Sequence, residues 1–203
     1  SSVKGRIPDV LKGFIVNRVQ PLCIHPMFGP GSRTQIKKIL LLPIFDAESE
    51  QDVVTTLFPN AQIILTTQEE HDRAMALTIS LPYLVNMALA SVYVEEDIAL
   101  LQQMGGTTFT MQLLLTSSVM SNDSCLHKSM HTTNEHSIRI LSKFQSTFRK
   151  SLMTLTRDVD EFVESYRALQ GNLGHKVDLN EKYHEMYHIL EAMGKISTEE
   201  VGR

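Results

Sequence analysis

The chain changes character at residues 61–70, which read AQIILTTQEE. Ala61–Leu65 is a short aliphatic run, which is typical of a strand. Thr67 is followed three residues later by Glu70, the spacing of a capping box, so we expect a helix to begin there. Beyond Thr66 the sequence predicts no further strand. Residues 61–70 therefore separate an α/β part from a helical part.

Strands and helices alternate before this point. The pattern predicts helices at Ile7–Phe14 and Glu48–Leu57, and strands at Val19–Ile24 and Lys38–Ile44. Short strands separated by short helices suit an open, mostly parallel sheet. We assign residues 1–66 to an α/β domain on this basis.

After Thr67 the apolar residues recur at helical spacing. The first predicted helix runs to about Val94, with a kink at Pro82. Apolar residues from Ile138 to Leu169 follow steps of three and four, which predicts one long helix that Gly171 ends. We expect residues 67–203 to be all-helical. Because this stripe is too long for one small domain to cover, we expect a homodimer; the alternative is the core of a monomeric bundle.

The composition limits the possible partners. The chain has 203 residues, a net charge of −4 and two cysteines, so non-specific nucleic-acid binding is not expected. Cys23 and Cys125 lie far apart, which indicates neither a disulfide framework nor a zinc site and favours a reducing cytoplasm. We expect no uncharged apolar run to reach the length of a membrane span; the longest runs, such as Ile39–Phe45, suit a buried strand, so no membrane partner is expected.

Two histidine pairs raise the question of a metal. His127 and His131, like His184 and His188, are four residues apart, so each pair shares a helix face. A metal site needs further ligands and a supporting shell of hydrogen bonds. Because such pairs on polar helices are usually solvated surface, no metal is predicted.

The candidate for chemistry is His25, within residues 23–31, CIHPMFGPG. It follows a predicted strand and precedes a loop with glycines, where open α/β sheets place their sites. An imidazole titrates near neutral pH and can accept a proton during a reaction. The alternative is a histidine that closes a strand–loop junction, and position alone does not separate the two.

The hexapeptide His-Pro-Met-Phe-Gly-Pro, residues 25–30, resembles the catalytic segment of prephenate dehydrogenases. Supporting segments lie where that family has similar ones, and the similarity runs along nearly the whole chain. These segments are Ser2-Val3-Lys4, Glu70-His71-Asp72, Asn122-Asp123 and Asn134-Glu135.

The resemblance implies the C-terminal part of a Rossmann-like NAD(P)-binding domain, followed by a helical dimerisation domain. It implies oxidation of prephenate to 4-hydroxyphenylpyruvate and carbon dioxide, with hydride transfer to NAD or NADP, in tyrosine biosynthesis. The dinucleotide-binding Gly-x-Gly-x-x-Gly turn does not occur in the sequence. We therefore expect an N-terminal portion to be missing, and the isolated chain to bind NAD(P) negligibly.

The resemblance also implies roles for single residues. His25 takes the proton of the ring hydroxyl, and Ser2 orients it. Ser2, Pro26 and Met27 contact the cofactor.

Relatives often hold the substrate with a histidine in the Leu-Pro-Tyr region and an arginine after the double glycine. Those places here hold Tyr83 and residues near Met111. We therefore expect Tyr83, Arg33 and Lys4 to bind the dianionic substrate; for Arg33, a solvated loop residue or a contact with the cofactor phosphate are alternatives.

Two further functions stay open. The chain could belong to an arogenate dehydrogenase, since arogenate differs from prephenate only in an amino group that replaces the side-chain keto group. It could also be a non-catalytic helical dimer that binds a regulatory ligand. Nucleotide binding by the full-length protein separates the enzyme from the regulatory module.

Overall fold

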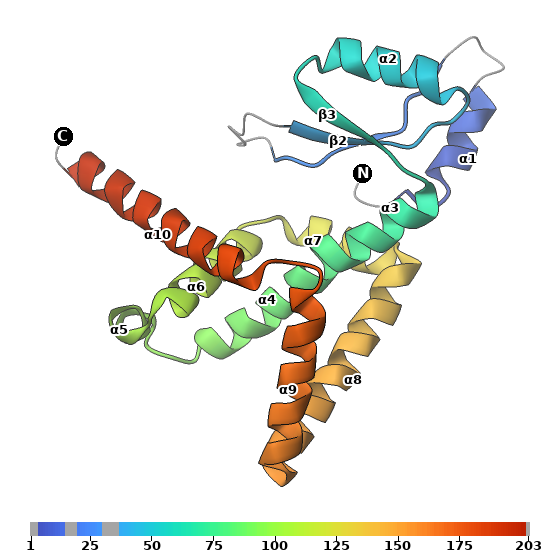
Figure 1. Cartoon of the computed structure of the whole chain (residues 1–203). Coiled ribbons are helices and arrows are strands. Elements are labelled where there is room, and N and C mark those ends of the chain that lie inside the picture. The colour runs from blue at the N-terminus through green and yellow to red at the C-terminus, as the bar shows by residue number, and fades with distance from the viewer. Residues whose placement is uncertain (1–3, 15–19, 30–36, 202–203) are drawn as a thin grey trace. The chain divides into compact units, whose positions relative to one another are not determined.

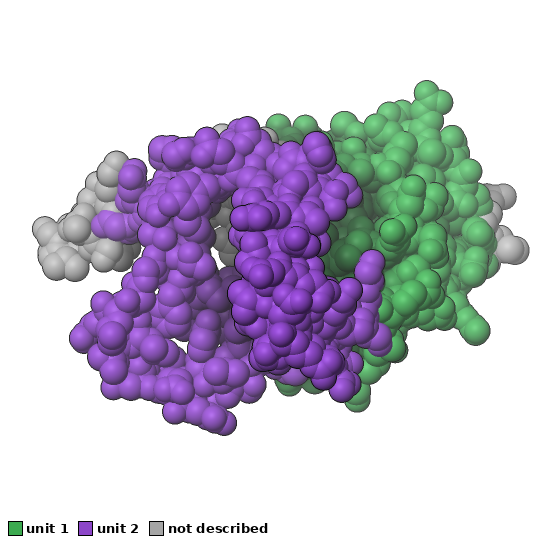
Figure 2. All heavy atoms as spheres, turned by 60° about the horizontal axis from the view of Figure 1, so that its bottom comes forward, with its two compact units in different colours: residues 1–83, 123–141 green, residues 84–122, 142–203 purple. Residues whose placement is uncertain are grey.

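The computed structural model describes residues 4–14, 20–29 and 37–201, apart from the side chains at positions 126, 129 and 195–201. It divides into two compact units, coloured separately in Figure 2. Unit 1 comprises Ser1–Tyr83 and Asp123–Leu141, and unit 2 comprises Leu84–Asn122 and Ser142–Arg203. The predicted boundary between residues 66 and 67 concerns domains rather than compact units, and it stays a prediction.

Unit 1 contains a sheet with the strand order β1-β2-β3. The strands are β1 (Ile24–Pro26), β2 (Lys37–Leu41) and β3 (Ala61–Leu65). β2 and β3 are parallel, but β1 runs antiparallel to β2. The expectation of a mostly parallel sheet is therefore wrong for β1. Only ten residues, 27–36, connect β1 to β2, and a parallel crossover needs about a dozen or more.

Helices lie against this sheet (Figure 1). Val54 of α2 (Ala47–Leu57) packs with Ile39 and Leu41 of β2, and all three are fully buried. Leu11 of α1 (Ile7–Lys12) packs against a second cluster, formed by Cys23, Leu42 and Ile44. The two predicted helices and the predicted strand Ala61–Leu65 are thus confirmed, although α1 ends at Lys12 and not at Phe14.

The turn from β2 into α2 is organised by the buried carboxylate of Glu50. Its oxygen Oε1 accepts hydrogen bonds from the main-chain N–H groups of Ile44, Phe45 and Asp46, at 2.9, 2.7 and 3.3 Å. The side chain therefore satisfies donors that the sheet and the helix leave unpaired.

Replacing Glu50 by alanine is expected to lower the free energy of unfolding by about 3 kcal/mol, because several buried donors lose a charged acceptor. Urea unfolding measures this value. Glu48, exposed in the first turn of the same helix, is the matched control, and Glu48→Ala should cost less than about 1 kcal/mol. Equal losses in the two variants would contradict this role of Glu50.

A continuous helical stretch follows β3. It consists of α3 (Gln68–Met75), the π-helical segment η2 (Ala76–Ser80) and α4 (Leu81–Tyr93). The capping box of Thr67 and Glu70 is present, as predicted. The predicted irregularity near Pro82 takes the form of η2: the N–H of Leu81 reaches back five residues to the carbonyl of Ala76. A wider turn here relieves the clash that proline makes with the preceding turn of an α-helix.

This stretch, Gln68–Tyr93, is long and apolar enough to cross a membrane by length and composition, since an 18-residue window within it has a mean hydropathy of 1.6. The sequence from Ala74 to Val94 carries no charged residue, so the expectation that no apolar run reaches this length is wrong. The core helices of soluble proteins also meet this criterion of length and composition. Within unit 1, the hydroxyl of Ser137 donates to buried Ser80 at 2.8 Å. Within unit 2, buried Asn86 accepts from Thr116 at 2.8 Å.

The rest of the described chain is helical, so the predicted fold class, α/β followed by all-α, is confirmed. The predicted single helix over Ile138–Leu169 is wrong, because Asp158 is extended and caps a new helix by accepting from the N–H of Glu161. Gly171 lies inside that second helix. The remaining helices are α5 (Ile98–Met104), α6 (Thr107–Met120), α7 (Ser124–Thr132), α8 (Glu135–Arg157), α9 (Val159–Gly174) and α10 (Leu179–Val201).

The apolar stripe of α8 and α9 is open to solvent in the single chain. Figure 2 shows openings between parts of unit 2. Phe148 is 61% exposed and Leu169 is 64% exposed. We name the following set of unit 2 the exposed stripe: Phe144, Phe148, Leu152, Leu155, Val159, Tyr166 and Leu169.

Candidate active site

His25 lies in the middle of β1, opposite Leu40 of β2. The structure thus places it within a strand rather than just after the predicted strand at Val19–Ile24. The side chain is buried, with 8% of the residue exposed. Its Nδ1 atom lies 3.0 Å from Nε2 of His71. The strand therefore delivers His25 to a second histidine that is 46 residues away in sequence.

His71 lies in the first turn of α3 and is almost fully buried. The capping box fixes this turn, and the N–H of His71 bonds to the carbonyl of Thr67 at 2.9 Å. Its Nδ1 atom lies 2.8 Å from Oδ1 of Asp72. Asp72, His71 and His25 therefore form a chain of contacts, which we call the Asp–His–His chain.

Asp72 connects two other segments of unit 1. Its carboxylate accepts hydrogen bonds from the main-chain N–H groups of Lys4 at 3.0 Å and Gly5 at 3.1 Å. Its carbonyl accepts from the side-chain amide of Asn134 at 2.7 Å. These bonds hold the carboxylate in one orientation, so the ring of His71 is also fixed.

The contacts determine where the protons lie. A carboxylate can only accept, so Nδ1 of His71 carries its proton and Nε2 of the neutral ring is an acceptor. Nδ1 of His25 must then donate to that atom. The remaining nitrogen of His25, Nε2, then carries the basic lone pair of the neutral ring, which can accept a proton from a ligand.

Burial and charge keep His25 neutral. Burial, and to a lesser degree the neighbouring His71, lower the pKa of His25 to about 4. Burial also lowers the pKa of His71, while the hydrogen bond and the charge of Asp72 oppose that change. At neutral pH His25 is therefore unprotonated at Nε2, as a proton acceptor must be.

The other predicted residues have mixed positions. Ser2 and Arg33 lie outside the described residues. Pro26 and Met27 follow His25 and are half-buried, and the N–H of Met27 bonds to the carbonyl of Lys38 at 2.8 Å.

Lys4 and Tyr83 remain candidates for substrate contact. Lys4 is buried, and its ammonium donates to the carbonyl of Ile24 at 2.8 Å, so the structure gives it a role in holding β1. Tyr83 is half-buried, with its ring centroid 4.9 Å from that of His127. Their binding to substrate stays a prediction.

Sequence reasoning missed the role of Asp72 and Asn134 and left His71 without one. The spacing of these residues contains no signal for the contact with His25, since the chain must fold to bring them together. A usable signal was the acidic residue directly after the histidine at a helix start, because buried histidines commonly donate to carboxylates.

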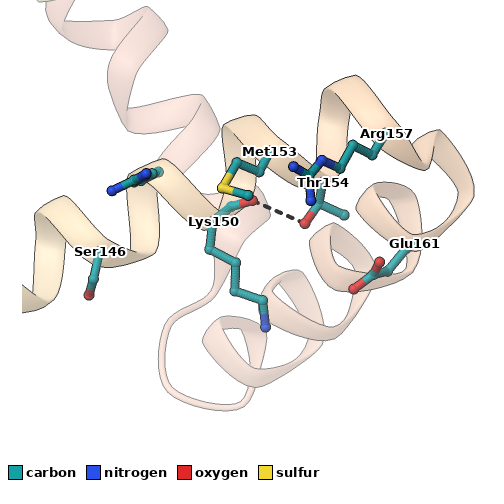
Figure 3. Close-up of a pocket in the computed structure, with 7 residues that line it drawn as sticks. Ser146, Lys150, Met153, Thr154, Arg157 and Glu161 are labelled. Atoms are coloured by element: carbon teal, nitrogen blue, oxygen red, sulfur yellow. Dashed lines mark hydrogen bonds between the residues drawn. The ribbon is translucent and has the colours of Figure 1, made fainter.

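A polar hollow of about 200 Å³ borders Asp72 in unit 1. Its lining residues are Gly5, Arg6, Asp9, Gln68, Glu69, Asp72, Thr133, Asn134, Glu135 and His136. A separate hollow of about 340 Å³ lies at the corner between α8 and α9 in unit 2 (Figure 3). It contains none of the predicted site residues.

Comparison with known families decides the assignment. Residues 67–168 match the family model described as "Prephenate dehydrogenase, dimerization domain", which is just over half of the chain. The chain belongs to the prephenate dehydrogenase family. Among the described residues no group of three or more histidine, cysteine, aspartate or glutamate side chains is placed to hold a metal ion.

Solved structures of this family share the fold. Prephenate dehydrogenase from Aquifex aeolicus is 18% identical, with a TM-score of 0.64 over 86% of this chain and 65% of that one. The complex of that enzyme with hydroxyphenyl propionate and NAD+ is 17% identical, with a TM-score of 0.63 over 87% of this chain and 65% of that one. Arogenate dehydrogenase from Synechocystis is 21% identical, with a TM-score of 0.57 over 77% of this chain and 61% of that one. The chain thus spans less than two thirds of the length of these relatives.

Proposed function

We propose that this chain forms the proton-accepting and dimerising part of an enzyme that oxidises prephenate to 4-hydroxyphenylpyruvate and carbon dioxide in tyrosine biosynthesis. The observation that carries the proposal is the Asp–His–His chain, which places the basic lone pair of a neutral, buried His25 on Nε2. Oxidation of a hydroxyl group needs such a base, since the hydroxyl becomes acidic as hydride departs.

The proposed cofactor is NAD or NADP, which supplies the hydride acceptor when bound. Pro26 has no N–H, and the N–H of Met27 is already bonded to Lys38. These residues would hold the cofactor by apolar contact, which fits a flat nicotinamide ring and not a pyrophosphate. Ser2 is proposed to contact the cofactor as well and to orient His25.

His25 accepts the hydroxyl proton at Nε2 in this proposal. Burial excludes water from the ring, so the lone pair is kept for the substrate. Tyr83 and Arg33 would contact the carboxylates. The enzyme is proposed to act in the cytoplasm, where the thiols of Cys23 and Cys125 stay free.

A second copy of the chain is proposed to cover the exposed stripe. The match to a dimerization domain supports this proposal, as does the exposure of large apolar side chains along α8 and α9. Contiguous apolar surface of this kind marks an interaction site.

The full-length protein tests the function directly. We expect it to reduce the nicotinamide cofactor when supplied with prephenate, with stoichiometric release of carbon dioxide and 4-hydroxyphenylpyruvate. Arogenate and prephenate are compared by kcat/KM, with NAD and NADP each in turn. A preference for arogenate would replace prephenate as the substrate, and no turnover with either would favour the regulatory module.

A further inference from the structure

We infer that His71 and Asp72 are positioning residues that take up the positive charge created when His25 accepts the substrate's proton. The working base is then a pair of histidines, and its conjugate acid is a His71 imidazolium beside the Asp72 carboxylate. This inference rests on the proposed function, because it concerns the same proton.

The geometry provides a continuous path for the charge. The two contacts, His25 Nδ1 to His71 Nε2 at 3.0 Å and His71 Nδ1 to Asp72 Oδ1 at 2.8 Å, are both buried hydrogen bonds. The carboxylate is fixed by the N–H groups of Lys4 and Gly5. Neither ring can rotate away without breaking these contacts, so the direction of proton movement is set.

The proton balance is simple. The O–H bond of the substrate breaks and an N–H bond forms at Nε2 of His25. The N–H bond at Nδ1 of His25 breaks and one forms at Nε2 of His71. His25 is neutral again, and His71 carries the charge with both nitrogens protonated. After the product leaves, the same steps in reverse return the proton through Nε2 of His25 to solvent.

The charge is more stable on His71 because only that ring touches a carboxylate. A carboxylate in direct contact favours the protonated imidazole, and the effect is strong away from water. His25 is held by the neutral main chain of β1 and by His71. Among the described residues, the charged and titratable groups near the pair and Asp72 are Lys4, Cys23 and, around the polar hollow, Arg6, Asp9, Glu69, Glu135 and His136.

Nitrogen NMR of the histidine rings in the 203-residue chain tests the location of the charge without any turnover. At neutral pH we expect both His25 and His71 to carry their proton on Nδ1. On acidification, we expect His71 to become doubly protonated while His25 stays neutral and moves its proton from Nδ1 to Nε2. Double protonation of His25 beside a neutral His71 would overturn the inference. Spectra of the His25→Asn and His71→Gln variants assign the signals.

The kinetic test uses Asp72→Asn in the full-length enzyme. Because the carboxylate raises the pKa of the pair, its loss should move the acidic limb of the kcat/KM profile down by on the order of one to two pH units. A weaker base should also lower kcat by about tenfold to a hundredfold, with KM little changed. Asp52→Asn makes the same exchange at an exposed position of α2; it is the matched control and should keep the wild-type profile.

The outcomes separate this inference from the proposed function. If His25→Asn abolishes turnover but Asp72→Asn leaves the pH profile unchanged, only the role of the pair is wrong. If His25→Asn is fully active, the proposed function of His25 is wrong. Should Asp72→Asn fail to fold, the NMR experiment on the unaltered chain still decides.

Discussion

Replacing His25 by asparagine is expected to lower turnover on the order of a hundredfold or more, with a much smaller effect on KM. An asparagine amide can still donate to Nε2 of His71, so the contact between β1 and α3 has a substitute. What the variant lacks is the basic nitrogen at the position of Nε2. Steady-state kinetics of the full-length enzyme, with prephenate and cofactor varied separately, measure both constants.

His131→Asn is the matched control for this variant. Like His25, His131 is a histidine of unit 1 whose pKa is lowered by burial, but it is only half-buried and its ring faces His127, at 6.4 Å between centroids. It should retain turnover close to that of the wild type. A His25→Asn enzyme with unchanged kcat would remove His25 from the mechanism.

The second large effect is expected in assembly. The wild-type chain should sediment as a dimer at micromolar concentration, and the double variant Phe148→Asp, Leu155→Asp as a monomer. The two side chains are 61% and 44% exposed in the single chain, so their replacement removes little from the fold of the protomer. In a dimer, burial of each side chain would contribute roughly 1.5–3 kcal/mol, and symmetry makes each contribution count twice. The double variant should therefore raise the dissociation constant of the dimer by more than about a thousandfold.

Ser142→Asp, Ser146→Asp adds the same two charges to α8 on the side away from Phe148, since both positions lie more than about 100° around the helix from it. This control should remain dimeric. Circular dichroism separates dissociation from unfolding in either variant. A wild-type chain that sediments as a monomer would end the dimer proposal.

Local signals in the sequence were sufficient for several elements. The strand Ala61–Leu65 and the capping box at Thr67 were both predicted, because a few neighbouring residues determine each. The break between α8 and α9 was not, although Asp158 and Glu161 have the spacing of a helix start. An apolar stripe at steps of three and four can continue across a single extended residue, so periodicity concealed the cap.

Tertiary information was missing in two places. The sequence predicted a strand near His25 but not its antiparallel direction, which depends on the short connection to β2. His25 was found as a candidate base, while its partner His71 and the carboxylate of Asp72 were not connected to it. These contacts arise only when β1 is placed against the first turn of α3.

The π-helical segment η2 has a consequence for insertions and deletions in this helix. A π turn holds one residue more than an α turn at nearly the same length. Removing one residue from Ala76–Ser80 would therefore restore a regular helix and leave Tyr83 facing nearly the same direction relative to His71, because both kinds of turn close one revolution. Removing one residue from the α-helical part between them, Asp72–Met75, would instead rotate Tyr83 by about 100°. The direction of Tyr83 relative to the base therefore tolerates the loss of a residue in the π turn but not in the α-helical turn before it.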